Sequence, residues 1–184
     1  MSILKVARMG HPVLRKKAQP VAPGDIKSTR VQRLIEDMFE TMSEYSGIGL
    51  AAPQVHQSMR IFVAGVREAD GTPEELTGDS EMPYIALVNP EFTIVGDGID
   101  EGWEGCLSIP DIRGLVPRAA EIHVDAYDRR GRRIQLKARG LPSRVIQHET
   151  DHLDGVLFFD RMRSLATLAY MDEYQRYWSK HADE

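Results

Sequence analysis

Residues 147–155 read QHETDHLDG, and the interpretation of the whole chain depends on this stretch. On a helix, residues four positions apart lie on the same face, so His148 and His152 can present two imidazole rings to one point. Glu149 projects about 100° around the helix axis from His148. It can therefore lie beside a metal held by the two histidines and act as a general base without being a ligand. The stretch predicts a metal-binding helix.

The flanking residues favour the same helix. Pro142 and Ser143 suit its first turn, and Gly155 stands where a helix would end. Two histidines at this spacing also arise by chance on amphipathic helices. The intervening carboxylate favours the metal, because a buried carboxylate is costly unless it has a partner or a task. The pattern alone neither separates a metalloprotease from other metal hydrolases nor identifies a third ligand.

The composition indicates one globular domain over residues 1–184, of which 42% are hydrophobic and 28% charged. The net charge of -5 argues against binding DNA through bulk charge. No apolar run approaches the roughly 18 residues that a membrane span requires, and the N-terminus lacks the apolar core of a signal peptide. Cys106 is the single cysteine, so it cannot form an internal disulfide, and we expect a cytoplasmic protein.

Helical and strand patterns alternate along the chain. An apolar stripe with helical spacing predicts a helix over residues 29–45, with Thr29 and Gln32 as its capping box. Strands are expected over residues 60–66, 84–88 and 92–95, the last two joined by a turn at Asn89 and Pro90, and a polar, acidic loop over residues 67–82.

The second half of the chain predicts a hairpin and a final helix. Alternating residues around 122–126 and 133–137 indicate a β-hairpin with one buried face, and His123 lies on its polar face. A helix capped by Ser164 is expected to pack on the body through the apolar side chains Leu165, Leu168, Met171 and Trp178.

Residues 47–54, GIGLAAPQ, formally match a dinucleotide-binding fingerprint. That fingerprint needs a strand before it and a helix after it. Here a helix precedes the glycines and Pro53 interrupts the segment after them, so nucleotide binding is disfavoured. Glycines also allow a backbone to approach a ligand closely, and Gln54 is then a candidate hydrogen-bond donor into a site.

Three segments together resemble the signature motifs of peptide deformylases: residues 47–54 (GIGLAAPQ), 104–108 (EGCLS) and 147–155 (QHETDHLDG). They occur in the family's order, and the resemblance covers nearly the whole chain. It implies an α+β fold in which mixed or antiparallel sheets pack around a central metal-binding helix, with a C-terminal helix. It also implies one catalytic domain that removes the N-formyl group from newly made polypeptides.

The resemblance places Cys106 on the metal with His148 and His152. A free cysteine is by default a small buried hydrophobe, so this assignment depends on the motif. Three protein ligands leave a position open for water, as catalytic metals require. The family implies Fe2+, one per chain, and the same ligands would also hold Zn2+ or Ni2+.

The implied reaction is attack of a metal-bound hydroxide on the formyl carbonyl. Glu149 accepts the proton and later delivers it to the departing amine. The family pattern assigns the stabilisation of the oxyanion to the Gln54 side chain and the backbone N–H of Leu107. It assigns to the Gly49 carbonyl a hydrogen bond from the substrate amide.

By the same resemblance, the methionine pocket would be lined by Ile48, Trp103, Leu141 and Val145. Arg113 would lie beside the peptide backbone. Glu104 and Arg118 are expected to form a buried pair behind the site that holds Cys106 and Leu107 in place.

Two other functions stay open from the sequence: a His-Glu-x-x-His metallopeptidase, and an inactive relative that keeps the metal for structure. As partners we expect formyl-methionine nascent chains and weak ribosome association, for a monomer that binds neither DNA nor membrane. The C-terminal tail carries no net charge, because Arg161, Arg163, Arg176 and Lys180 balance Asp172, Glu173, Asp183 and Glu184. It therefore lacks a strong electrostatic footprint for RNA.

Overall fold

The structure is a computed structural model that describes residues 2–66, 73–77 and 82–179. Its α-helices are α1 (Thr29–Glu44), α2 (Leu141–Leu153) and α3 (Met171–Tyr177). Its strands are β1 (Gly49–Ala51), β2 (Ile61–Ala64), β3 (Glu75–Leu76), β4 (Ile85–Ile94), β5 (Ile99–Cys106), β6 (Ile109–Ala119), β7 (Glu121–Tyr127), β8 (Arg133–Arg139) and β9 (Ala169–Tyr170).

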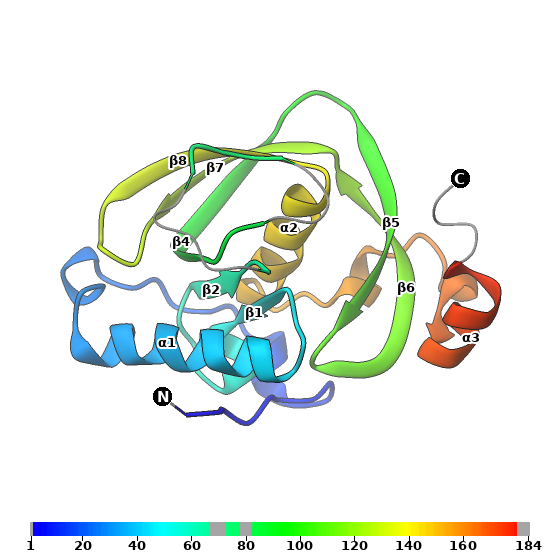
Figure 1. Ribbon diagram of the computed structural model, residues 1–184, viewed down its shortest axis with the longest axis horizontal. Helices are drawn as coiled ribbons and strands as arrows, with labels where there is room; N and C mark the ends of the chain where they lie inside the picture. The colour runs from blue at the N-terminus through cyan, green and yellow to red at the C-terminus, as the bar shows by residue number, and fades with distance from the viewer. Residues whose placement is uncertain (1, 67–72, 78–81, 180–184) are drawn as a thin grey trace.

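The strands form two sheets around α2. The larger has the order β1-β2-β4-β7-β8-β3 and the smaller β5-β6-β9. All pairs are antiparallel except β3 with β8. Figure 1 shows α2 at the centre, between the larger sheet and the β5–β6 hairpin, and α2 contacts β1, β2 and β8 of one sheet and β6 of the other. The expected α+β fold around a central helix, with a helix near the C-terminus, is confirmed.

Strand β2 shows how the two main helices cover opposite faces of the larger sheet. Successive side chains of a strand point to opposite faces. Phe62 belongs to the buried cluster that includes Ile146 of α2, and its neighbour Val63 belongs to the cluster that includes Met38 of α1. All four residues of β2 are buried, so this strand is packed on both faces.

Helix α1 confirms the predicted apolar stripe but not the predicted cap. Ser28 is the N-cap residue, and its Oγ accepts a hydrogen bond from the Val31 N–H at 3.3 Å. Gln32 does not close a capping box with Thr29. Its side-chain amide instead donates to the Ile26 and Arg129 carbonyl oxygens, both at 2.8 Å, and so ties α1 to the turn after β7.

The prediction of a turn at Asn89 and Pro90 is wrong. Both residues lie inside β4, and the register with β7 shifts between Val88 and Glu91, which is a β-bulge. Asn89 adopts φ 51°, and its side chain donates to the Val21 carbonyl at 2.7 Å and accepts from the Val21 N–H at 2.8 Å. The strand bends there without reversing. The hairpin of β7 and β8 is confirmed, with His123 exposed.

The predicted final helix begins later than expected. Ser164 caps only a 3-10 turn over Leu165–Thr167, after which β9 pairs with β6 and α3 follows. Leu165 is 66% exposed, so the packing predicted for this side chain is wrong. The packing predicted for Trp178 is confirmed, because its ring contacts Trp103 of β5 at a centroid distance of 5.4 Å. The ring of Tyr174 also contacts Trp103, at a centroid distance of 4.8 Å.

Of the predicted acidic loop over 67–82, residues 67–72 and 78–81 lie outside the described part of the chain. The part between them contributes β3, which runs parallel to β8. Within the described residues, none of the helices has the length and apolar character to cross a membrane.

The turn between β7 and β8 is held by the buried carboxylate of Asp128. Asp128 is buried, and its carboxylate accepts hydrogen bonds from the Arg130 and Arg132 backbone N–H groups at 2.9 and 2.8 Å and from the Arg132 side chain at 2.7 Å. Burial raises the pKa of Asp128, but these donors outweigh it and hold the pKa below the ordinary 3.8. The carboxylate therefore stabilises the fold above that pH, and this stabilisation is lost as the pH falls through the folded-state pKa.

We expect Asp128→Asn to lower the free energy of unfolding at neutral pH by about 1–3 kcal/mol. The difference from the parent protein should shrink as the pH is lowered to about 3, because the stabilisation by the carboxylate is lost as the pH falls from its ordinary pKa of 3.8 toward the lower folded-state pKa. Urea unfolding at both pH values measures this difference. An equal difference at both would show that the charge of Asp128 does not stabilise the turn.

Candidate active site

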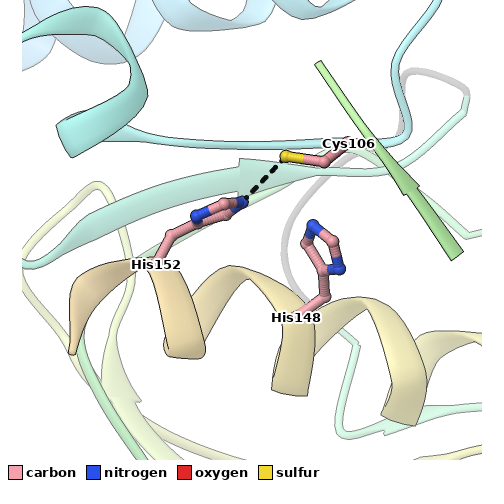
Figure 2. Close-up of side chains that lie close together, drawn as sticks. All are labelled: Cys106, His148 and His152. Atoms are coloured by element: carbon pink, nitrogen blue, oxygen red, sulfur yellow. Dashed lines mark hydrogen bonds between the residues drawn. The ribbon is translucent and has the colours of Figure 1, made fainter. Parts of the chain in front are cut away.

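Helix α2 presents two histidines toward the end of β5. Gly140, with φ 67°, precedes the helix, and Gly155, with φ 75°, follows it, so both ends are set by backbone conformations that favour glycine. His148 and His152 point from one face of α2 toward Cys106 (Figure 2). The Cys106 Sγ lies 3.2 Å from Nε2 of His152. One ligand atom from each of the three residues lies within 4.8 Å of the others.

The chemistry of this donor set fits a divalent transition metal. A thiolate and two imidazole nitrogens are the ligands that zinc and iron sites use, and three ligands leave a position open. His148 and His152 are 9% and 1% exposed, so the donors are largely withdrawn from water. These three residues could therefore hold a metal ion.

Glu104 orients the first histidine. Its Oε2 lies 2.8 Å from Nδ1 of His148. Burial raises the pKa of Glu104, but Arg118 and His148 outweigh it and lower the pKa to about 2. The carboxylate is thus ionised, so His148 Nδ1–H is the donor and Nε2 is left for a metal. Hydrogen bonds of this kind fix the tautomer and ring orientation of metal-binding histidines.

Glu104 and Arg118 form a buried, two-pronged ion pair. The Arg118 Nε and Nη2 atoms donate to Oε1 and Oε2 at 2.8 and 2.9 Å. The remaining Nη1 donates to Asp151 of α2 at 2.5 Å, and Asp151 also accepts from Arg161. The Glu104–Arg118 pair expected behind the site is therefore present, and through Asp151 it extends to α2.

Glu149 lies in the same site with little solvation. It is 4% exposed, and its Oε2 has no hydrogen-bond partner among the described residues. Burial raises the pKa of Glu149 to about 7. A carboxyl that titrates near neutral pH can both accept and return a proton.

Gln54 reaches the same place from the turn after β1. Its Oε1 accepts from the Ala51 N–H at 2.8 Å, which holds the amide in place. Its Nε2 donates to the Ser108 Oγ at 3.1 Å and lies 3.4 Å from the Cys106 Sγ. The side-chain donor is thus fixed beside the cluster of possible metal ligands.

A cavity of about 610 Å³ opens in front of these groups. Among its lining residues are the expected site residues Ile48, Gly49, Gln54, Trp103, Glu104, Cys106, Leu107, Arg113, Leu141, Val145, His148 and Glu149. The expected residues His152 and Arg118 lie behind this wall, where they contact Cys106 and Glu104. Arg113 places its guanidinium over Gly105, where an added Cβ would lie 2.7 Å from Nη1.

Arg144 and Met171 are among the lining residues that were not expected from the sequence. Arg144 lies four positions before His148, so the same helical spacing that relates the histidines could have pointed to it. Met171, at the start of α3, also lines the cavity. It joins the site through the pairing of β9 with β6, for which the sequence carries no local signal.

Comparisons with known proteins agree with this fold and site. A family model described as polypeptide deformylase matches residues 3–167. The chain is 40% identical over 179 residues to peptide deformylase 2 of Nostoc sp., covering 97% of both chains. It is 41% identical over 167 residues to peptide deformylase 1 of Bordetella pertussis, covering 91% of this chain and 92% of the relative.

Solved structures show the same likeness. A Met-Ala-Ser-bound class I type b peptide deformylase from Acinetobacter baumannii has a TM-score of 0.79 and 37% identity, covering 88% of this chain and 100% of that one. The peptide deformylase of Thermotoga maritima has a TM-score of 0.77 and 36% identity, covering 89% and 100%. The chain belongs to the polypeptide deformylase family, and it is an enzyme.

Gly49 packs closely against the Glu149 side chain. A Cβ added at Gly49 would lie 2.7 Å from the Glu149 Cδ. Gly49→Ala should therefore displace the carboxylate and lower kcat on a formylated peptide by about 100-fold, the scale of a 1 Å misplacement. Bound metal, measured by elemental analysis, should stay unchanged, because none of the three possible ligands is touched.

Gly24→Ala is the matched control, since a Cβ there meets nothing within 4 Å. Full activity of Gly49→Ala would show that Glu149 does not need the position that it has here.

Proposed function

We propose that this enzyme hydrolyses the N-terminal formyl group of formyl-methionine in newly synthesised polypeptides, as one cytoplasmic catalytic domain over residues 1–184. The observation that carries the proposal is the convergence of five side chains at one site in a chain of this family. These are Cys106, His148 and His152 with Glu149 and Gln54 beside them.

The metal would be held by Cys106, His148 and His152, and we propose Fe2+ as its natural identity, with Zn2+ or Ni2+ able to replace it. When bound, the metal supplies Lewis-acid activation of a water and of the formyl carbonyl. The cysteine sulfur supports this choice of metals, because a soft thiolate ligand suits iron and zinc better than magnesium or calcium.

Glu149 is proposed to move the proton. Its raised pKa of about 7 allows it to accept a proton from the attacking water and to return it to the amine nitrogen as the C–N bond breaks. The products are formate and a free N-terminal amine. Because Oε2 has no protein partner among the described residues, one oxygen of this carboxylate is free for that transfer.

Gln54 and Leu107 are proposed to stabilise the oxyanion of the tetrahedral intermediate. The Gln54 amide is already fixed by the Ala51 N–H, so little reorganisation is needed when charge develops on the oxygen. Leu107 directly follows Cys106, and its N–H would be the second donor. Loss of one such donor typically costs on the order of 10²–10³ in turnover.

The substrate is proposed to bind as an extended peptide. The Gly49 carbonyl would accept from its amide, Ile48, Trp103, Leu141 and Val145 would surround the methionine side chain, and Arg113 would lie beside its backbone. The Acinetobacter baumannii relative was crystallised with Met-Ala-Ser, a peptide that begins with methionine. This supports a peptide with N-terminal methionine in the same cavity.

The function is tested with one peptide carrying a formyl, an acetyl or no group on its N-terminal methionine. We expect release of formate from the first and no reaction with the other two, because the formyl group is the smallest acyl group and a tight site admits it alone. A metallopeptidase would cleave an internal bond of all three. Internal cleavage without release of formate would overturn the proposal.

The roles within the site are tested by two substitutions. Glu149→Ala should keep the metal and lose turnover, because Glu149 is proposed to transfer protons without being a ligand. Cys106→Ala should lose metal, turnover and thermal stability together, since a bound metal stabilises the fold that binds it. Elemental analysis and thermal unfolding separate the two results. A Glu149→Ala protein purified without metal would show that the roles are wrongly assigned.

Ribosome association is proposed to be weak and not to depend on the tail alone. The described part of the tail is already engaged within the chain, because β9 pairs with β6 and Tyr174 contacts Trp103. Co-sedimentation with ribosomes at physiological salt should give little bound protein. Tight binding that is lost when the chain ends near Arg163, with deformylation of short peptides retained, would contradict this proposal.

A further inference from the structure

Arg144 is a buried charge that the proposed reaction does not use. It lies in the first turn of α2, four residues before His148, and it is 7% exposed. Burial of a guanidinium is costly unless its N–H groups are hydrogen-bonded. Arg144 meets this condition through contacts that all lead to the β5–β6 hairpin.

The contacts of Arg144 join α2 to both strands of that hairpin. Nη1 donates to the Val116 carbonyl at 2.8 Å and to the Gly102 carbonyl at 3.2 Å. Nη2 donates to the carbonyl and the carboxylate of Asp100 at 2.8 and 3.0 Å. The strand that ends at Cys106 is thus fastened to the helix that carries His148 and His152.

One further contact reaches the metal site. Nη1 of Arg144 also donates to Oε1 of Glu104 at 2.9 Å. Oε1 therefore accepts from Arg118 and Arg144, and Oε2 accepts from Arg118 and His148. A carboxylate has about four acceptor positions, and in Glu104 all of them are used. Its orientation, and with it that of the His148 ring, is fixed by two guanidinium groups.

Gly102 provides the space for this arrangement. A Cβ at Gly102 would lie 2.8 Å from both Cζ and Nη2 of Arg144. The guanidinium of Arg144 therefore occupies the space that a side chain at position 102 would take. Substitution at Gly102 can therefore displace Arg144 without removing any charge.

We infer that Arg144 is a positioning residue of the metal site: by holding the Glu104 carboxylate in place, it fixes the orientation of the His148 ring. This role rests on the metal site of the proposed function, but it does not depend on which reaction the site catalyses. It goes beyond the Glu104–Arg118 pair, because it makes a second guanidinium necessary for the same carboxylate.

The test is the affinity of the metal-free full chain for Co2+, measured by titration and from the visible spectrum of the bound ion. Arg144→Met, which keeps much of the side-chain length but removes the donors, should weaken Co2+ binding by about 10–100-fold, the effect typical of residues that orient metal ligands. Arg144→Lys should recover part of this loss. Circular dichroism confirms that the variants are folded.

A double variant separates positioning from general stability. If Arg144 acts through Glu104, Arg144→Met with Glu104→Gln should bind Co2+ little more weakly than Glu104→Gln alone, because coupled residues are not additive. Losses that multiply, or a folded Arg144→Met protein with the affinity of the parent, would overturn the inference.

Gly102→Ala gives the answer should Arg144→Met fail to fold. It should weaken Co2+ binding, whereas Gly98→Ala should not, since a Cβ at Gly98 meets only the Ala120 Cβ at 3.4 Å. Equal affinities of these two variants would overturn the inference. A parent protein that binds Co2+ in this pattern but does not release formate would overturn the proposed function alone.

Discussion

The ionised carboxylate of Glu104 is the group on which the site depends. It belongs to β5 of the β5–β6 hairpin, and it accepts hydrogen bonds from His148 of α2 and Arg118 of β6. With its pKa lowered to about 2, it keeps its charge at neutral pH. Without that charge, Nδ1 of His148 would lose its acceptor, and the guanidinium of Arg118 would be buried with only Asp151 as a partner.

Close packing around Glu149 complements this network. The carboxylate lies against Gly49 without room for a methyl group, and burial shifts its pKa to about 7. Two glutamates a short distance apart therefore have opposite properties. All acceptor positions of the Glu104 carboxylate are hydrogen-bonded and the group is ionised at neutral pH, whereas Glu149 is desolvated and able to change its protonation state. Environments that separate the pKa values of two such groups are typical of acid–base sites.

The sequence predicted those parts of the site that depend on local geometry. His148 and His152 share a helix face because of the helical period, and both ends of α2 could be read from Pro142 and Gly155. Cys106 could not be placed in this way, because its distance from the histidines depends on how the β5–β6 hairpin meets α2. Only the resemblance of residues 104–108 to a family motif brought it to the site.

The errors have the same physical origin. Asn89 and Pro90 suit a turn locally, but the side chain of Asn89 binds the Val21 backbone and the strand continues as a bulge. Ser164 does cap a turn, but pairing of β9 with β6 ends it after three residues. Arg144 was missed because a charged residue in the first turn of a helix is ordinarily solvated. In each case a contact distant in sequence overrides a local preference.

Cys106, His148 and His152 are proposed to hold one metal ion beside Glu149. The most direct test is anomalous diffraction at the iron absorption edge, from protein that is purified and crystallised without oxygen. We expect a single peak bonded to the Cys106 sulfur and to Nε2 of both histidines, with Glu149 outside the ligand shell. A peak ligated by Glu149 without Cys106, or no metal at these residues in an active preparation, would contradict the claim.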